Sequence, residues 1–427
     1  MSSVATSPGT ARSGRGQFTE LFTGGGRSRR LLWLFVGVVV LFSVARVLSG
    51  QEALTSSSTF SAALLLAVPI GLAALGGLFS ERAGVVNIGL EGMMILGTWG
   101  AGWAGYQWGW GAAVLAGLLF GAVGGLLHAV ATVTFGVDHV VSGVAINILA
   151  AGVVRFLSEL LYVDNAAGGG AAQSPALSNR PPDFSLPVLS SGPDLLGDLE
   201  SQHWFLISDL AGLLRGLTHE VGVLTLIAVL LIPASYLVLW RTAFGLRLRS
   251  CGENPAAADS LGVPVYRLKY IAVLISGGLA GLGGVFLVFV ANIYREGQTG
   301  GRGFIGLAAL IFGNWRPGGL AAGAGLFGFA DALQLRSRTA VVALLLLVAL
   351  LLAALAVGQA VQRRIVSAVI AAVFAAASLV GFLLIDTLPP GIVFFTPHLT
   401  TLLVLSLASQ RLRMPAADGL VYRRGEQ

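Results

Sequence analysis

The nonapeptide GLAALGGLF at residues 71–79 recurs as GLAGLGGVF at residues 278–286, with seven of its nine positions identical. Each copy is followed by a second short match in the same order, Ile88–Leu90 after the first copy and Ile305–Leu307 after the second. Two matches in one order and at similar spacing indicate a duplicated unit. Both copies lie within long apolar runs, so the repeated unit is predicted to be part of a membrane domain.

The composition supports this placement in a membrane. The chain has 427 residues, of which 55% are hydrophobic and only 11% charged, with a mean hydropathy of +0.83. Soluble globular chains carry about 25% charged residues, so a water-soluble enzyme and a disordered chain are both excluded. We predict one all-α polytopic domain surrounded by membrane lipid, rather than the several soluble domains that the length alone would suggest.

Twelve apolar runs follow one another along the chain and are predicted to cross the bilayer. They cover residues 31–49, 60–79, 84–106, 111–134, 140–162, 220–240, 268–291, 303–313, 318–335, 339–358, 365–386 and 395–409. The transmembrane domain is therefore assigned to residues 31–409, and residues 410–427 are expected to form a cytoplasmic tail. The run 303–313 is too short for an ordinary span, so we expect a half-helix, a tilted helix or a helix surrounded by protein.

The distribution of arginines gives the orientation of the spans. Residues 1–30 are rich in Ser, Gly and Arg and are predicted to form a disordered cytoplasmic tail. An even number of crossings returns the C-terminus to the same side. With this threading the acidic loop 163–219 is extracytoplasmic, whereas the basic loop 241–267 is cytoplasmic. Arg336 and Arg338 fall outside and are the main exception to the rule.

The same threading gives the two copies of the repeat opposite directions, with 60–79 running inward and 268–291 running outward. Inverted repeats are typical of transporters, whose substrate sites lie near the midplane where glycine-interrupted segments of the two halves meet. The segments that fit this description are residues 84–97 and 300–317. The alternative is that their glycines only allow close packing of helices.

Three polar residues within the apolar runs are candidates for the substrate path. Asn87 and Glu91 are four positions apart and would share one helix face, and a carboxylate in the hydrocarbon layer is a functional candidate by default. The alternative is a structural Glu91, hydrogen-bonded to backbone freed at Gly89 or Gly92. Asn147 in the fifth run has two alternative roles as well, as a substrate ligand or as a contact between helices.

Two helix starts carry further candidates. Asp138 and His139 open the fifth run, where Asp138 is predicted to cap the helix rather than to act in acid–base chemistry. At the start of the half-helix, free N–H groups at Gly303 would meet acceptor atoms of a substrate, and Phe304 would stack on a flat ring. Packing is the alternative role for Phe304.

The predicted cytoplasmic loop contains the sequence GENPAAADSLGVP at residues 252–264. Asn254 followed by Pro255 is typical of an N-cap and a first helical position, and Gly262 shortly before a proline is a stop signal. The sequence thus predicts a short helix. Because such a helix is marginal in water, we expect it to dock on a partner, the alternative being a linker.

Several function classes are excluded by residues that the sequence lacks. A P-loop needs a lysine within GxxxxGK[ST], and the only lysine, Lys269, stands before Tyr270. The single cysteine, Cys251, rules out an internal disulfide, and the five histidines show no metal-ligand spacing. The basic residues flank apolar runs and form no patch, so nucleic acid is not an expected partner. Since no catalytic constellation stands out, we do not expect an enzyme.

The stretch ERAGVVNIGLEG at residues 81–92, together with the loop at 252–264, resembles the permease subunits of bacterial ABC importers for ribose, branched-chain amino acids and nucleosides. The first stretch resembles the signature of the nucleoside branch, whose permeases work with a basic-membrane-protein-type lipoprotein. Supporting matches occur at residues 137–147, 168–175, 303–317 and 419–425. The resemblance covers most of residues 60–335 and the C-terminus.

The resemblance implies a core of ten spans, a path between this chain and a second, non-identical permease, and residence in a bacterial cytoplasmic membrane. It also implies that ATP and magnesium bind to a separate ATPase subunit, that this chain holds no cofactor, and that an extracytoplasmic lipoprotein delivers the substrate. By position, Asn87, Glu91 and Asn147 would line the path. The residues that would contact the ATPase are Glu253, Asn254, Pro255, Ala256, Ala257, Asp259 and Leu261. Residues 337–386 depart from the family pattern as an added two-helix hairpin.

These observations favour import of a nucleoside by the permease of an ATP-driven transporter. Within that class, import of ribose, another simple sugar or a branched-chain amino acid is the alternative. A proton-coupled secondary transporter that uses Glu91 is the alternative of another class, and a non-transporting scaffold would leave the repeat and the intramembrane polar residues without a purpose. The short cytoplasmic helix and the scarcity of acids favour the ATP-driven permease.

Overall fold

The computed structural model describes residues 27–163, 165–190, 192–336, 338–385 and 412–424. Within these residues the fold is mostly helical, and seven helices are long and apolar enough to cross a membrane. The prediction of an all-α polytopic membrane protein is therefore confirmed. The predicted run 395–409 and residues 1–26 lie outside the described part of the chain.

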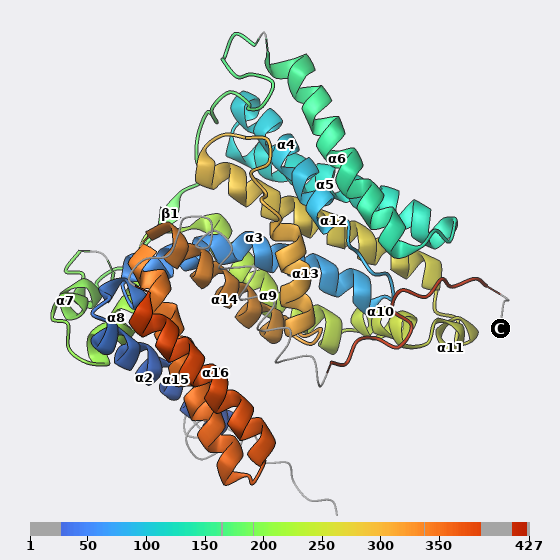
Figure 1. The fold of residues 1–427 in the computed structure, drawn as a ribbon. Coiled ribbons are helices and arrows are strands. Elements are labelled where there is room, and N and C mark those ends of the chain that lie inside the picture. Colours follow the sequence, from blue (N-terminus) through green and yellow to red (C-terminus); the bar gives the residue numbers. More distant parts are fainter. Residues whose placement is uncertain (1–26, 164, 191, 337, 386–411, 425–427) are drawn as a thin grey trace, which may run out of the picture.

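Each predicted span within the described residues coincides with a helix (Figure 1). The helices before the long external loop are α2 (Arg27–Ser49), α3 (Ser57–Arg82), α4 (Leu90–Trp108), α5 (Trp110–Ala129), which a π-helical turn (Val130–Thr134) extends, and α6 (His139–Tyr162). Those after it are α9 (Val223–Arg241), α10 (Ala243–Glu253), α11 (Pro255–Ser260), α12 (Val265–Ala291), α13 (Arg302–Phe312), α14 (Pro317–Arg336), α15 (Arg338–Val361) and α16 (Ile365–Leu384).

Two helix starts differ from the prediction. α2 begins at Arg27, inside the segment predicted to be a disordered tail. α4 begins at Leu90 instead of residue 84, because residues 83–89 form a turn between α3 and α4. Gly84 in this turn has a φ of +81°, a conformation that favours glycine over residues with a side chain.

The two repeat helices, α3 and α12, pack against each other and are largely buried in the centre of the bundle. α3 also packs against α13 and α14, and α12 packs in the corresponding way against α4 and α5. A Cβ atom on Gly97 of α4 would lie 2.4 Å from the Cα atom of Gly281 on α12, so glycine is needed for this close approach. The matching contacts of α3 and α12, each with helices of the other half, are expected of a duplicated unit. The inversion of one copy relative to the other stays a prediction.

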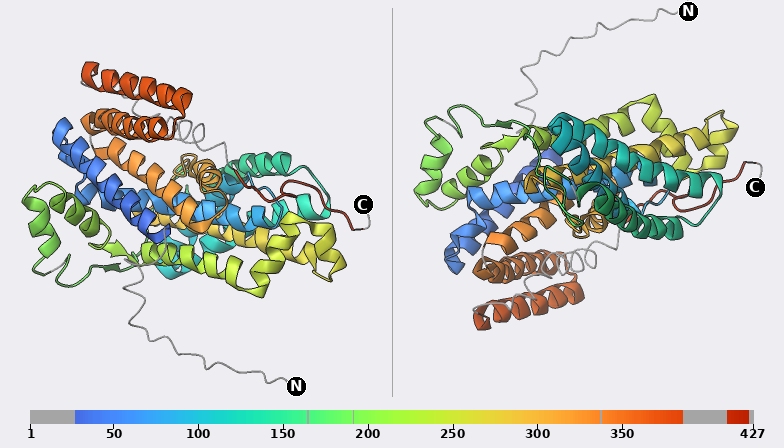
Figure 2. Two further views of the ribbon diagram at one scale, coloured as in Figure 1. Left: turned by 90° about the horizontal axis from the view of Figure 1, so that it is seen from below. Right: turned by 90° about the horizontal axis from the view of Figure 1, so that it is seen from above.

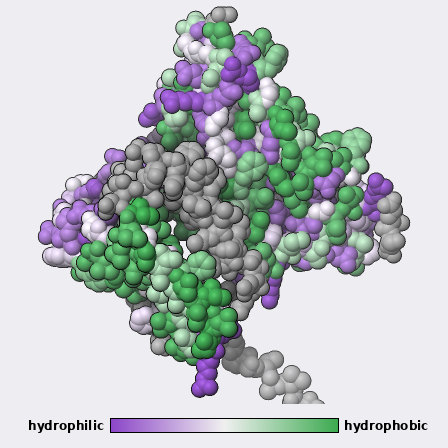
Figure 3. Space-filling view, viewed as in Figure 1, coloured by the Kyte–Doolittle hydropathy of each residue, from purple (hydrophilic) through white to green (hydrophobic). Residues whose placement is uncertain are grey.

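α15 and α16 form a hairpin beside the main bundle, which Figure 2 displays from two further sides. α15 packs on α2 and α14, whereas α16 packs on α15. The expected two-helix hairpin is thus present within the predicted insertion. Hydrophobic side chains gather over the hairpin and over the outer face of α6 in Figure 3. Exposed apolar surface of this extent is expected where helices face lipid or another subunit.

The predicted external loop 163–219 is only partly a loop. Its second half contains α7 (Leu195–Ser201) and α8 (Ile207–Gly216), which the sequence analysis did not predict. Two short strands, β1 (Asp183–Phe184) and β2 (Val221–Gly222), pair in antiparallel fashion. In this register Asp183 is opposite Gly222, so the strands close the loop at its base just before α9.

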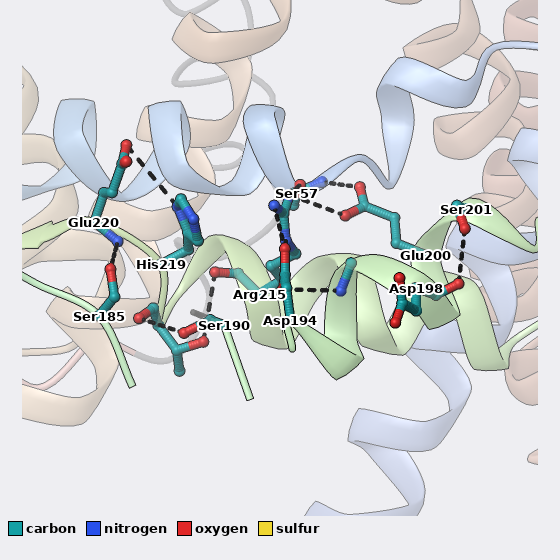
Figure 4. A network of polar contacts seen from close by, with 12 residues as sticks. Ser57, Ser185, Ser190, Asp194, Asp198, Glu200, Ser201, Arg215, His219 and Glu220 are labelled. Carbon is teal, nitrogen blue, oxygen red and sulfur yellow. Dashed lines mark hydrogen bonds and ion pairs between the residues drawn. The ribbon is translucent and has the colours of Figure 1, made fainter. Parts of the chain in front are cut away.

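Polar contacts hold α7 and α8 on the N-terminal end of α3 (Figure 4). Arg215 of α8 forms an ion pair with Asp194 at 2.7 Å and donates a hydrogen bond to the Ser57 hydroxyl group at 3.1 Å. The Ser57 amide in turn donates to the Glu200 carboxylate at 2.7 Å. The Arg215 guanidinium holds the pKa of Asp194 below its usual value. These charge-assisted bonds explain why acidic residues of the loop fold back onto the bundle.

Candidate functional site

The two segments that were predicted to meet, 84–97 and 300–317, are in direct contact. Glu91 lies in the first turn of α4 with only 6% of its surface exposed. Its Oε1 atom accepts a hydrogen bond from the Gly301 amide at 3.0 Å, and its Oε2 atom accepts one from the Gly303 amide at 2.7 Å. The carboxylate therefore satisfies backbone donors at the N-terminus of α13, where a negative charge is favourable.

This geometry refines the structural alternative for Glu91. The sequence predicts backbone near Gly89 or Gly92 as its partner, whereas the donors belong to the other copy of the repeat. Gly303 is required at this contact, since a Cβ atom there would lie 2.5 Å from the Cα atom of Glu91. The start of α13 thus packs closely on α4 at Gly303, which supports a helix too short for an ordinary span.

Asn87 does not lie on the same helix as Glu91, so the expectation of a shared helix face is wrong. Asn87 is fully buried in the turn before α4. Its amide nitrogen donates to the Ser276 hydroxyl group of α12 at 2.8 Å, and its amide oxygen accepts from the Gly89 backbone at 3.1 Å. The Asn87 side chain therefore stabilises the turn internally and also connects the turn with α12, the second repeat helix.

Asn147 of α6 contacts the same turn and the start of α4. Its amide oxygen accepts a hydrogen bond from the Gly92 backbone at 2.7 Å, and its amide nitrogen donates to the Ile88 carbonyl group at 3.1 Å. We call Asn87, Glu91, Asn147 and Gly303 the polar junction. It connects the turn and α4 with α6, α12 and α13 through hydrogen bonds between segments that are far apart in the sequence.

Phe304 differs from the junction residues because its side chain is 47% exposed. It follows Gly303 directly in α13, so an aromatic ring projects beside the junction at the start of the half-helix. A ring in this position is available to stack on a flat ligand or to pack on a neighbouring chain.

Two histidines that the sequence analysis set aside also hold the turn. The Nε2 atom of His128 lies 3.0 Å from the Val86 carbonyl oxygen, and its Nδ1 atom lies 2.9 Å from the Ser142 hydroxyl group. The Val86 amide donates to Nδ1 of His139 at 3.3 Å. The only sequence signal was the presence of histidine in apolar runs. Asp138 accepts from the amides of the first turn of α6, which confirms it as an N-cap.

The short helix predicted in the loop 252–264 is present as α11. Asn254 is its N-cap, and its side chain accepts from the Ala257 amide at 3.0 Å. Pro255 occupies the first helical turn, as predicted. Ala257 is exposed and Leu261, just beyond the helix, is 84% exposed, so an open face with an apolar residue is available to a partner.

The remaining residues of this set point in different directions. Glu253 and Asn254 are exposed, whereas Pro255 and Ala256 are half-buried. Asp259 is engaged by Arg424, with its Oδ2 atom 3.0 Å from the guanidinium Nε atom. Burial raises the pKa of the neighbouring Cys251 thiol to about 11, so this cysteine behaves as an apolar packing residue.

The two most specific sequence motifs meet in space. A Cβ atom on Gly252 would lie 2.4 Å from the Arg82 carbonyl oxygen and 3.0 Å from the Gly84 amide, so the backbones of the two motifs touch. The Arg82 side chain donates to the Trp315 carbonyl oxygen at 2.7 Å and lies 3.8 Å from the Glu253 carboxylate. Residues 81–92 therefore connect the α10–α11 segment at one end with the polar junction at the other.

Among the described residues, no group of three His, Cys, Asp or Glu side chains is placed to hold a metal ion. The arrangement instead provides a multi-pass bundle in which a surface helix is linked through one glycine turn to a buried polar junction between two similar halves.

Comparison with known proteins assigns the family. Residues 59–355 match the family described as branched-chain amino acid transport system / permease component, and the chain belongs to it. The guanosine ABC transporter permease protein NupQ of Bacillus subtilis is 40% identical over 282 residues, which are 64% of this chain and 81% of that protein. The nucleoside ABC transporter permease protein NupC of Lactococcus lactis is 35% identical over 64% of this chain and 80% of its own length.

A third relative aligns over more of the chain. A putative glucose ABC transporter permease protein of Haloferax volcanii is 32% identical over 383 residues, covering 86% of this chain and 98% of that protein. No solved structure matches this chain. The chain is a multi-pass permease subunit of the ABC transporter class, as the resemblance of residues 81–92 implied.

Proposed function

We propose that this chain forms the translocation path of an ATP-driven importer for nucleosides. The observation that carries the proposal is the continuous connection from the open face of α11, through the contact of Gly252 with Arg82 and Gly84, to the polar junction around Glu91. The names of the two relatives from Bacillus and Lactococcus support the choice of a guanosine or other nucleoside as substrate.

In the proposed mechanism, movement of an ATPase subunit drives the movement of helices in this chain. A separate ATPase subunit, which binds ATP and magnesium, docks on the face that contains Ala257 and Leu261. Its movement displaces α10 and α11, and the backbone contact at Gly252 passes this displacement to the turn between α3 and α4. Because Glu91 binds the start of α13, the turn and the half-helix move together and change access to the path. In this proposal the exposed Phe304 ring stacks on the nucleobase.

A second permease subunit, not identical to this chain, is proposed to face α5 and α6. A groove of about 620 Å³ lies on this surface, lined among others by Leu127, Val141 and Ile148. Val141 and Ile148 are 62% and 71% exposed, and such an apolar face suits another membrane subunit. The path would then run between Phe304 and the facing chain.

The orientation is proposed from the position of α11. If the ATPase docks there, residues 412–424, which lie against α10 and α11, are cytoplasmic as well. The loops with α7 and α8 then face outward, where a substrate-binding lipoprotein would deliver the ligand. In this proposal both termini are cytoplasmic, as the distribution of arginines predicts.

Sugar import is the second candidate. It is favoured by the Haloferax relative, which is named as a putative glucose permease and aligns over 98% of its own length. Proton-coupled transport has less support, because both oxygens of Glu91 already accept backbone hydrogen bonds from the start of α13.

Uptake by proteoliposomes tests the proposal. The chain is reconstituted with its ATPase and second permease, supplied with the binding lipoprotein, and offered labelled guanosine, uridine, ribose, glucose and leucine. ATP-dependent accumulation of guanosine or uridine is the expected result. Accumulation of sugar without nucleoside would overturn the substrate, and uptake by this chain alone under a proton gradient would overturn the mechanism.

A further inference from the structure

The segment 412–424, which was expected to be a simple cytoplasmic tail, is packed along the surface that the ATPase is proposed to use. We call it the C-terminal strap. Figure 1 displays it in dark red beside α10 and α11. Its first part is fixed by the Arg413 amide, which donates to the Asn314 side chain at 2.7 Å, and by the Ala416 amide, which donates to the Glu253 carboxylate at 3.3 Å.

The middle of the strap is buried at the contact between the two sequence motifs. The Ala417 amide donates to the Gly252 carbonyl oxygen at 2.8 Å, and the Ala417 side chain is only 6% exposed. A Cβ atom on Gly84 would lie 3.2 Å from the Ala417 carbonyl oxygen, so three backbone segments meet here without intervening side chains. Asp418 is 8% exposed and interacts with the carboxyl group of Glu81 at the end of α3.

The last part of the strap reaches the docking helix itself. The ring of Tyr422 lies 5.7 Å from that of Tyr266 at the start of α12, measured between centroids. Arg424 forms its ion pair with Asp259 on α11 at 3.0 Å. The strap thus runs from the turn before α14, across the motif contact, to α11, and it leaves Ala257 and Leu261 open.

α11 has only six residues, a length at which a helix is not stable without tertiary contacts. Its buried side is supplied by Ala258, which packs with Cys251, Val265 and Leu268. Asp259 lies on this helix beside Ala258 and is held by the strap. The contacts of α11 with the strap therefore help to decide where its open face lies relative to the membrane domain.

We propose that the C-terminal strap is a positioning element of the ATPase-docking surface, and that Asp259 acts through Arg424 rather than by touching the ATPase. The inference rests on the proposed function, since it presumes that an ATPase docks on α11. Asp259 then positions α11 instead of contacting the ATPase. Ala417, Tyr422 and Arg424 join the residues on which coupling to the ATPase depends.

The first test detaches the middle of the strap in the full-length chain. Ala417→Trp places a large side chain at a position that is only 6% exposed, and Leu420→Trp makes the same kind of change at a position that is 60% exposed. Dissociation constants for the purified ATPase subunit are measured on both variants in nanodiscs. We expect Ala417→Trp to weaken binding at least tenfold and Leu420→Trp to leave it unchanged. Normal binding by an Ala417→Trp variant whose strap is cleaved by protease would overturn the proposal.

The second test uses surface substitutions that do not threaten folding. Arg424→Glu and Asp259→Arg each break the ion pair, whose exposed position limits the effect to a few-fold. If Asp259 acts through the strap, the double variant Asp259→Arg/Arg424→Glu recovers the affinity for the ATPase. If Asp259 touches the ATPase, the double variant stays as weak as Asp259→Arg or weaker, and the positioning role is rejected. Arg413→Ala is the matched control, because Arg413 binds Asn314 through its backbone amide.

A failure of the proposed function gives a different result. If no ATPase binds to the wild-type chain, or if Ala257→Arg on the open face leaves binding unchanged, the docking surface itself is misplaced. If Ala257→Arg abolishes binding while the strap variants have no effect, docking on α11 stands and the positioning role of the strap falls.

Discussion

The carboxylate of Glu91 on α4 binds the amide of Gly303 on α13 at 2.7 Å, across 212 positions of sequence. One side chain thereby connects the two copies of the repeat at the point where each is interrupted by glycine. The contact makes the start of the half-helix depend on the position of the turn between α3 and α4. Four predictions follow this connection outward from the junction to the surface.

Glu91→Ala is expected to abolish transport and to leave assembly with the ATPase intact. The substitution removes the acceptors of two amides at the buried start of α13, which should lower the free energy of unfolding by about 1–3 kcal/mol. Glu91→Gln keeps one acceptor and should give intermediate transport. Uptake and thermal unfolding are measured on the same proteoliposome preparations.

Glu159→Ala on α6 is the control for Glu91, because its side chain is 53% exposed. It should leave uptake and the unfolding temperature unchanged. Loss of assembly in Glu91→Ala would show that Glu91 only maintains the fold and has no separate part in transport.

Gly252→Ala is expected to uncouple ATP hydrolysis from uptake. The added Cβ atom would lie 2.4 Å from the Arg82 carbonyl oxygen, and both neighbours there are backbone, so the two motifs must move apart. We expect transport per ATP hydrolysed to fall at least several-fold. Gly318→Ala on α14 is the matched control, since no atom lies within 4 Å of its added Cβ. An unchanged ratio in Gly252→Ala would remove the motif contact from the coupling route.

Ala257→Arg should prevent docking of the ATPase without affecting membrane insertion. Ala257 is exposed on α11, next to the open Leu261 side chain, and a long cation there would project into an apolar contact. Co-purification of the ATPase and protease protection of the membrane domain are the two measurements. Normal ATPase binding in this variant would exclude α11 as the docking helix.

Attachment of the C-terminal strap should weaken as the pH rises. Burial, together with the carboxyl group of Glu81, raises the pKa of Asp418 to about 9, although Lys269 of α12 acts in the opposite direction. In a detached strap Asp418 has its ordinary pKa of about 4. Between these values the detached state binds fewer protons, so stability of the packed strap is lost progressively as the pH increases from about 4 to about 9.

Limited proteolysis of the strap at pH 6 and pH 9 measures this dependence. Cleavage in the wild-type chain should be several-fold faster at the higher pH. Asp418→Asn, which stays neutral, should make the rate much less sensitive to pH. Equal rates for the wild-type chain at both values would contradict the raised pKa of Asp418.

Local patterns in the sequence were sufficient for the apolar helices and for two of the helix caps. Asp138 and Asn254 cap helices as predicted, because an N-cap bonds to amides only two or three positions ahead. The apolar runs within the described residues coincide with helices for the same reason, since the bonds of a helix are local. Residues 84–89 were wrongly included in a span, because the run is apolar and its turn depends on Gly84 and on partners elsewhere in the chain.

The sequence by itself determined the membrane class, the apolar helices, the paired glycine-rich segments and the family. Only the tertiary structure decided which donors Glu91 binds, where Asn87 points, and that α7, α8 and the C-terminal strap fold back onto the bundle. Each of these depends on hydrogen bonds or ion pairs between residues more than 100 positions apart, such as Glu91 with Gly303 and Asp259 with Arg424. Sequence periodicity indicates which face of a helix or strand is apolar. It does not specify which distant residue a polar side chain on that helix or strand will bind.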